Sequence, residues 1–174
     1  MRILLVGIGG YGGLIAQAVL DNREKYGYSV AGVVEPYIEN SPVRDQLENI
    51  PVYNSMQDFY KENKAELAII NTPIHLHKEQ CILAMEMGSD VLCEKPVAST
   101  LQDALQMEEA SKATGRSINI GFQLSYTPAV QNIKRDILDG RYGKIKSMYA
   151  TVSWPRNSAY FARPWAAKAT VDGK

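Results

Sequence analysis

Glu94, Lys95 and Pro96 stand directly after a short apolar run, and these three residues are well suited to acid–base chemistry. A lysine ammonium at such a point can donate a proton beside a substrate hydroxyl or carbonyl, or stabilise charge there. Glu94 would hold the lysine, and Pro96 would fix the turn. Taken alone, the tripeptide is more typical of a salt-bridged turn than of a site, so its meaning depends on its surroundings.

A second candidate is the glycine-rich stretch Gly7-Ile8-Gly9-Gly10-Tyr11-Gly12, which follows an apolar run and opens a helical pattern. In a dinucleotide fingerprint Gly7 allows the tight turn, Gly9 lets the backbone approach a pyrophosphate, and Gly12 lets the helix pack on the sheet. Backbone amides and the helix N-terminus then bind the phosphates. Glu35, at the end of the second apolar run, would accept from ribose hydroxyls and repel a 2′-phosphate, which favours NAD over NADP. A glycine-rich turn without a ligand and an S-adenosylmethionine site are the alternatives.

A third stretch, residues 71–77, follows another apolar run. Loops at the carboxyl ends of parallel strands surround the ligand crevice, so Thr72 and Pro73 would pass close to a bound cofactor. His77 would lie in the first turn of the next helix. Ordinary turn formation and helix capping is the alternative for this stretch, and it is the better interpretation for His75.

The elements that must position these residues can be read from periodicity. Apolar runs of strand length occur at 2–7, 29–35, 66–71, 90–93 and 117–122, with helical patterns between them. Strands that are continuously apolar and alternate with helices indicate a parallel sheet covered on both faces. We therefore predict one doubly wound α/β Rossmann domain over residues 1–123.

Two capping boxes are expected within that domain. Ser99 with Gln102 would begin a helix that ends near Gly115, and Ser55 with Asp58 would open a shorter one.

The pattern changes after residue 123. A helix is expected from Thr127-Pro128 to Leu138, closed by Gly140, and residues 144–154 read as a long strand. We interpret residues 124–174 as the start of a second, α+β domain that is cut off. A lone strand exposes its edges, so it should pair with another copy or be disordered.

Composition limits the classes of partner and the compartment that we expect for this protein. The 174 residues carry 19 basic and 19 acidic side chains, so net charge indicates neither nucleic acid nor a membrane as partner. Cys81 and Cys93 have no metal-ligand spacing, which favours buried thiols in a reducing compartment over a disulfide or a metal site. The first apolar run is too short for a signal peptide or a membrane span, so we expect a cytoplasmic protein.

Four motifs in this order resemble the Gfo/Idh/MocA oxidoreductases, the family of glucose-fructose oxidoreductase and inositol 2-dehydrogenase. They are GIGGYG at 7–12, TPIHLH at 72–77, EKP at 94–96 and GFQLSYTP at 121–128. The resemblance implies a Rossmann domain that carries NAD, with NADP less favoured, followed by a domain whose open sheet shapes the substrate site and commonly the oligomer interface. It implies reversible hydride transfer between the nicotinamide and a C–OH group of a sugar or polyol. Lys95 would be the catalytic residue near the nicotinamide, and the cofactor-binding residues would be Gly7, Ile8, Gly9, Gly10, Tyr11, Gly12, Glu35, Thr72, Pro73, His77, Glu94 and Gln123.

The sequence also departs from the family pattern. Ile74 replaces the asparagine of the usual TPN, and Ser125 replaces a familiar arginine. The family's Asp and catalytic His have no counterpart in this sequence, so the base would lie in a missing part and the 174 residues alone would turn over little or not at all. The stretch with Trp154, Arg156, Tyr160, Arg163 and Trp165 resembles the segment leading toward the substrate site. A non-enzymatic NAD sensor is the rival function.

Overall fold

The computed structural model describes residues 1–162 and residue 166. Two compact units divide the chain, Met1–Phe122 and Gln123–Lys174. Two residues of the aromatic and basic stretch, Arg163 and Trp165, lie outside the described residues.

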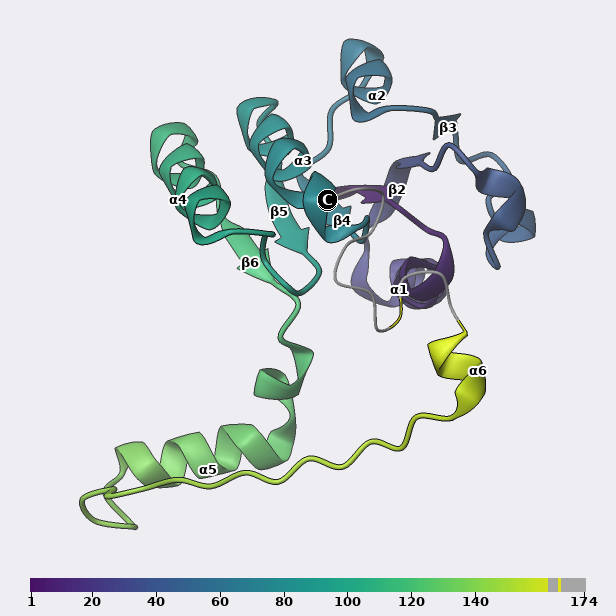
Figure 1. The fold of residues 1–174 in the computed structure, drawn as a ribbon. Helices are drawn as coiled ribbons and strands as arrows, with labels where there is room; N and C mark the ends of the chain where they lie inside the picture. The colour runs from purple at the N-terminus through teal and green to yellow at the C-terminus, as the bar shows by residue number, and fades with distance from the viewer. Residues whose placement is uncertain (163–165, 167–174) are drawn as a thin grey trace. The chain divides into compact units, whose positions relative to one another are not determined.

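The first unit alternates strands with helices along the chain (Figure 1). Its strands are β1 (Arg2–Val6), β2 (Ser29–Val34), β3 (Val52–Tyr53), β4 (Leu67–Ile70), β5 (Asp90–Cys93) and β6 (Ile118–Ile120). Its helices are α1 (Gly10–Tyr26), α2 (Met56–Glu62), α3 (Ile74–Glu86) and α4 (Leu101–Thr114), and two 3-10 turns, η1 (Ile38–Asn40) and η2 (Arg44–Gln46), follow β2. All strands are parallel, in the order β3-β2-β1-β4-β5-β6. The predicted doubly wound fold is confirmed, and β3 is an additional strand that periodicity did not indicate.

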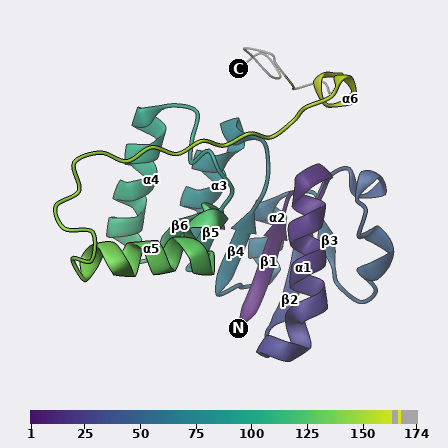
Figure 2. The ribbon, with the colours of Figure 1, turned by 90° about the horizontal axis from the view of Figure 1, so that it is seen from below.

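Both faces of the sheet are covered, as the continuous apolar runs predicted. In β1, Leu4 and Val6 pack in the cluster that α2, α3 and α4 cover, whereas Ile3 and Leu5 pack in the cluster that α1 covers. Figure 1 shows these helices on opposite sides of the sheet, and Figure 2 shows α1 running along β1 and β2. Burying each such side chain stabilises the fold by about 1.5–3 kcal/mol, so the doubly covered sheet is a rigid base for its loops.

The strand register brings the loops together. Val6 pairs with Val34 on one side and with Ile70 on the other, Ile70 pairs with Cys93, and Cys93 pairs with Ile120. These five residues form one row across the sheet at its carboxyl edge. The loop after each of these strands therefore starts from the same level, and the next residues of the chain include Gly7, Glu35, Asn71 and Glu94.

One of the two capping predictions needs correction. Ser55 caps α2 as predicted, with its Oγ accepting from the Asp58 amide at 3.1 Å. The cap of α4 is Thr100 and not Ser99, because it is the Thr100 hydroxyl that accepts from the Asp103 amide at 3.1 Å. Two boxes overlap in this stretch, and the capping distance of three residues is met from either position.

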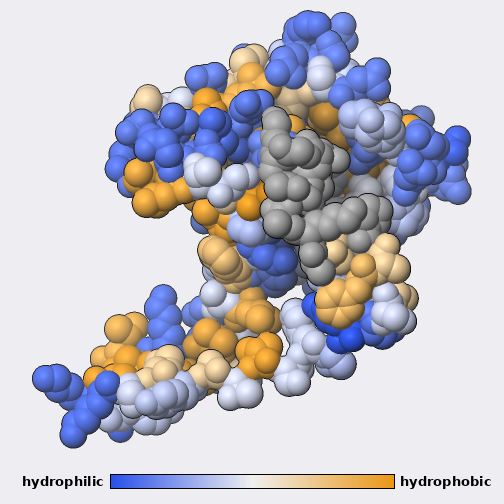
Figure 3. All heavy atoms as spheres, in the orientation of Figure 1, coloured by the Kyte–Doolittle hydropathy of each residue, from blue (hydrophilic) through white to orange (hydrophobic). Residues whose placement is uncertain are grey.

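The second unit contains η3 (Gln123–Tyr126), α5 (Pro128–Leu138) and α6 (Ser158–Phe161). The predicted α5 is confirmed, but the predicted strand at 144–154 is wrong, since no described residue there belongs to a strand. A strand needs a neighbour for its N–H and C=O groups, and the described residues supply none. Figure 3 shows apolar atoms on the surface of α5, and the apolar side chains of 145–154, including Met148 and Trp154, are also exposed.

Along the described residues, no helix combines the length and apolar character that crossing a membrane requires.

Candidate cofactor-binding and active site

The glycine loop has the geometry that a dinucleotide requires. Gly7 has φ +74°, a left-handed conformation that favours glycine. A Cβ on Gly12 would lie 2.0 Å from the carbonyl oxygen of Gly7, so only glycine lets α1 start this close to β1. Gly9 has an ordinary φ of −80°, and the atom nearest to a Cβ there would be Glu35 Oε2 at 3.6 Å, an ordinary contact. The fold therefore tolerates a methyl at Gly9, unlike one at Gly12.

The carboxylate of Glu35 is held against this loop by hydrogen bonds from backbone amides. Its Oε2 accepts from the amides of Ile8 and Gly9 at 2.9 and 3.0 Å, and its Oε1 accepts from the Tyr37 amide at 3.1 Å. A carboxylate has about four acceptor positions, so one position on Oε1 stays available for a hydroxyl group. The nearly buried charge also repels a second anion at the same place. This arrangement fits a ribose diol and disfavours a 2′-phosphate.

The residues present fit the phosphates of a dinucleotide as well. Helix α1 starts at Gly10, its N-cap Gly9 makes no side-chain cap, and its first turn carries no acidic residue. The positive end of a 17-residue helix therefore faces the loop, where it favours an anion. Beside Gly12, the Nδ2 of Asn71 is buried and has no hydrogen-bond partner among the described residues.

The Glu94-Lys95-Pro96 turn is not a salt-bridged turn. The Glu94 carboxylate accepts from the backbone amide of Lys95 at 3.0 Å, and a Cβ on Gly121 would lie 2.9 Å from its other oxygen. No ion pair found within the described part of the chain involves Lys95. Its exposed Nζ instead lies 5.9 Å from the centre of the Tyr11 ring, across from the start of α1. The expectation that Glu94 holds the lysine side chain is corrected, because the carboxylate binds the backbone amide of Lys95 and not its ammonium. The Lys95–Pro96 peptide bond is cis.

The loop after β4 packs directly on the glycine loop. The methyl group of Thr72 lies 2.8 Å from where a Cβ of Gly7 would be, and its hydroxyl donates to Gln80 Oε1 at 2.5 Å. Pro73 is the N-cap of α3. Thr72 and Pro73 therefore lie at the edge of the sheet next to the predicted phosphate loop.

His77 is placed in the first turn of α3, as expected, but it is buried, with 1% of its surface exposed. Its Nδ1 lies 2.9 Å from the carbonyl oxygen of Pro96, and its Nε2 lies 2.9 Å from the carbonyl oxygen of Thr72. The ring thus connects the loop after β4 with the loop that carries Lys95. Both nitrogens are occupied by protein, so direct contact with a cofactor is not its role in this structure.

Two buried free thiols, Cys81 and Cys93, interact with each other, and Cys93 also interacts with His77. The pKa of Cys93 is lowered to about 6, mainly by its hydrogen bond with Cys81 and then by His77, whereas the pKa of Cys81 is raised by the same hydrogen bond and by burial. Burial lowers the pKa of His77, but Cys93 and the two backbone carbonyls outweigh that effect and raise it. The Cys93 thiol also donates to the carbonyl oxygen of Glu94 at 3.4 Å.

Several residues that support the site had no signal in the sequence. The Ser41 hydroxyl donates to the carbonyl oxygen of Ile8 at 3.0 Å, and a Cβ on Gly13 would lie 2.3 Å from Pro42. Gln80 binds Thr72. These contacts link distant loops, so periodicity and spacing do not reveal them.

Most of the predicted site residues meet at one edge of the first unit. The glycine loop, Glu35, Thr72, Pro73, Glu94 and Lys95 all lie within a few residues of the carboxyl-edge row. Gln123 is the first residue of the second unit and lies in η3.

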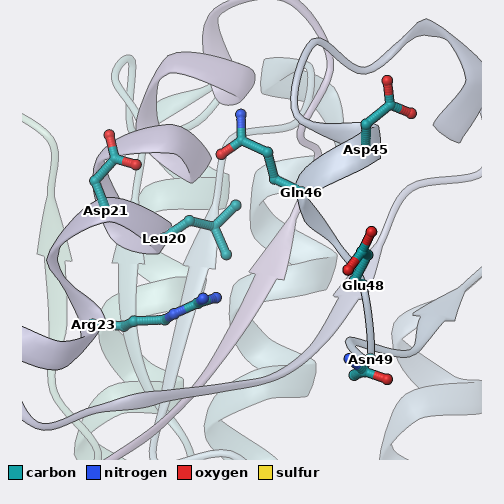
Figure 4. A pocket seen from close by; sticks show the side chains of 7 residues that line it. All are labelled: Leu20, Asp21, Arg23, Asp45, Gln46, Glu48 and Asn49. Carbon is teal, nitrogen blue, oxygen red and sulfur yellow. The ribbon is translucent and has the colours of Figure 1, made fainter.

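The first unit also has a cavity of about 480 Å³ at a different place. Figure 4 shows its lining from α1 and from the segment around η2: Leu20, Asp21, Arg23, Asp45, Gln46, Glu48 and Asn49. It includes none of the predicted site residues. Since α1 rises by about 1.5 Å per residue, this part of the helix lies roughly 15–20 Å from the glycine loop. The chemistry described above is not located in this cavity.

Comparison with known proteins agrees with the fold and the loop geometry. Residues 1–122 match the Gfo/Idh/MocA oxidoreductase family, described by its NAD-binding Rossmann fold. The chain therefore belongs to this family.

Individual relatives are similar over most of this chain. The chain is 28% identical over 162 residues to 2,7-anhydro-N-acetylneuraminate hydratase of Mediterraneibacter gnavus, which covers 87% of this chain and 42% of that protein. It is 27% identical over 146 residues to inositol 2-dehydrogenase 4 of Saccharopolyspora erythraea, covering 83% and 43%. The crystal structure of the WlbA dehydrogenase from Chromobacterium violaceum, in complex with NADH and UDP-GlcNAcA, aligns with a TM-score of 0.71 and 26% identity, over 82% of this chain and 41% of that one. The chain thus spans less than half the length of these relatives.

Proposed function

We propose that this chain is the cofactor-binding part of an NAD-dependent oxidoreductase that transfers hydride between the nicotinamide and a hydroxyl-bearing carbon of a sugar or polyol. Residues 1–123 are the NAD-binding domain. Residues 124–174 begin a second domain for substrate binding and oligomer contact. The exposed apolar surface of α5 and of 145–154 supports this division, because such side chains usually pack against further structure.

The observation that carries the proposal is the placement of one exposed lysine beside a dinucleotide loop. Gly9 and the start of α1 offer a phosphate site, Glu35 offers an acceptor for the ribose, and Lys95 Nζ lies near Tyr11 at the same edge. Pairing a redox cofactor with a fixed cation is what oxidation of an alcohol needs, since charge builds up on the substrate oxygen.

The residues of this chain then have distinct roles. Bound NAD supplies the carbon that accepts hydride. Lys95 binds the substrate oxygen through its ammonium, orients it, and stabilises the negative charge that develops there. Glu94 fixes the backbone from which the Lys95 side chain extends. The residues that we place at this edge include none suited to remove the hydroxyl proton, so we expect residues 1–174 to bind NAD and to turn over little or not at all.

Substituting Lys95 tests the proposal. In a protein that carries the complete second domain, Lys95→Ala should lower kcat for a sugar or polyol by about 10²- to 10⁴-fold with little change in NAD affinity. Lys64→Ala, at an exposed lysine outside the site, is the matched control and should leave both unchanged. An unchanged rate in Lys95→Ala would overturn the catalytic role and point to an NAD sensor. Robust turnover by residues 1–174 alone would overturn the placement of the base.

Compartment and assembly form part of the same proposal. The two buried free thiols, Cys81 and Cys93, support a reducing, cytoplasmic location. We propose that the complete protein is a homo-oligomer that associates through the sheet of its second domain. Light scattering of that protein tests this, and a monomer at micromolar concentration would contradict it.

A further inference from the structure

We propose that His77 is a positioning residue, a doubly protonated ring that ties the Lys95 loop to the Thr72 loop and so sets where the lysine stands. The role given to Lys95 rests on the proposed function, but the tie between the two loops does not. In this role His77 supports the site and does not contact the cofactor directly.

The geometry requires two donors on one ring. A backbone carbonyl oxygen only accepts hydrogen bonds, and each nitrogen of His77 lies 2.9 Å from one such oxygen. A neutral imidazole has one N–H, so in either tautomer one nitrogen lone pair would face a carbonyl oxygen at hydrogen-bond distance. The imidazolium removes this repulsion because both nitrogens then donate. The ring is 1% exposed, so water does not substitute for either partner.

A buried cation needs neighbours that stabilise its charge, and the two carbonyl oxygens are the first of these. Cys93, at the end of β5, interacts with His77, and Cys81, on α3 itself, donates toward Cys93. Glu94 is the next residue in the chain, and its negative charge opposes a thiolate at Cys93. On α3 the neighbouring Lys78 is already paired with Asp103 of α4 at 2.8 Å. Cys93 is therefore the ionisable group of this set that interacts with the ring, and its Sγ also lies 3.4 Å from the carbonyl oxygen of Glu94.

The two acceptors explain why this link matters for chemistry. Pro96 directly follows Lys95, and Thr72 packs on Gly7 of the phosphate loop. One ring therefore sets the distance between the lysine that would meet the substrate and the loop that would meet the cofactor. Charge-assisted hydrogen bonds of this kind hold a position more firmly than neutral ones.

Two conservative variants can separate the two halves of the link. The amide nitrogen of asparagine reproduces the donor at Nδ1, so His77→Asn keeps the bond to Pro96 and loses the bond to Thr72. The amide nitrogen of glutamine reproduces the donor at Nε2, so His77→Gln keeps the bond to Thr72 and loses the bond to Pro96.

The measurement uses the 174-residue chain labelled with ¹⁵N. Chemical shifts of the two ring nitrogens of His77 and of the backbone amides of Lys95 and Val97 are recorded at pH 7 without ligand.

Both ring nitrogens of the wild type should carry protons, with shifts of an imidazolium. The Lys95 and Val97 amides should move strongly in His77→Gln and little in His77→Asn, while amides of β1 stay unchanged as a test of folding. NAD affinity, measured by calorimetry, should fall about two- to tenfold in His77→Asn, which releases the cofactor-side loop. A single protonated nitrogen in the wild type, or equal Lys95 shifts in both variants, would overturn the inference. If the wild type binds no NAD, the proposed function fails, while the ring and amide shifts still decide the link.

Discussion

Adding a single methyl group at either of two glycines of the loop should separate folding from cofactor binding. At Gly12 the new Cβ would lie 2.0 Å from the Gly7 carbonyl oxygen, whereas an ordinary contact is 3.4–4 Å. At Gly9 the nearest atom is Glu35 Oε2 at 3.6 Å, which is an ordinary contact, and φ is −80°. Gly12→Ala therefore strains the protein, and Gly9→Ala does not.

The size of each effect follows from these distances. An overlap of more than 1 Å with backbone forces α1 away from β1, and overpacking of this kind costs about 1–3 kcal/mol or more. For a chain of this length each kcal/mol lowers the melting temperature by about 2–4 °C, so Gly12→Ala should melt roughly 2–12 °C lower. Gly9→Ala should melt at or slightly above the wild type.

NAD binding should show a different pattern. A methyl at Gly9 occupies the space through which a pyrophosphate reaches the backbone amides, and the loss of one or two charge-assisted hydrogen bonds corresponds to about 10- to 100-fold weaker binding. Melting followed by circular dichroism and NAD titration by calorimetry measure both quantities. If Gly12→Ala melts like the wild type, or if Gly9→Ala binds NAD equally well, the reasoning about the loop is refuted.

Three further predictions concern charge and capping. Glu35→Gln should reduce the preference for NAD over NADP by at least about tenfold in parallel titrations, because the charge that repels a 2′-phosphate is gone; an unchanged preference would contradict this. Thr100→Ala should lower the free energy of unfolding by about 1 kcal/mol in urea melts, whereas Ser99→Ala should change it little, and the reverse order would identify Ser99 as the cap. The pKa of His77 is raised above 6.5 in the folded chain. The free energy that the protonated ring contributes to folding is therefore fully present below pH 6.5, and it is lost as the pH rises through the raised pKa. The stability gap between the wild type and His77→Asn should therefore narrow as the pH increases above 6.5, and a gap that widens would show the opposite sign.

The sheet and the loop residues could be predicted because their signals are local or repeat at short range. Continuous apolar runs identified the buried parallel strands. Glu35, Thr72 and Lys95 each follow one of these strands closely, and the parallel register places them at the same edge of the sheet. This placement does not depend on side-chain contacts. Gly12 could also be interpreted correctly, since the close approach of a helix to a sheet requires a missing Cβ.

The remaining features depend on tertiary contacts that spacing does not encode. Strand β3 has two residues and pairs only with β2, so it has no periodicity to detect. The extended run at 144–154 has strand composition but no neighbour in the described chain, and composition alone cannot provide one. In α4, Leu101 and Leu105 are exposed and Met107 is the buried residue, a difference that helical periodicity alone does not provide.

The contact partners of His77 and Lys95 could not be predicted from the sequence either. His77 is joined to a carbonyl 19 residues away in the chain, and Lys95 meets a ring from the first helix. Such contacts follow from how the loops fold over the sheet edge. Sequence spacing placed both residues near the site, and only the structure distinguishes the residue that supports it from the residue that can meet a substrate.

The most direct test of the account is a comparison of ligands by thermal shift on the 174-residue chain. NAD at about 100 times its dissociation constant should stabilise the chain by about 2.7 kcal/mol, which raises the melting temperature by roughly 5–11 °C. NADP at the same concentration should raise it less, and S-adenosylmethionine should not raise it. A shift with S-adenosylmethionine and none with NAD would contradict the central claim that this edge of the sheet is an NAD site.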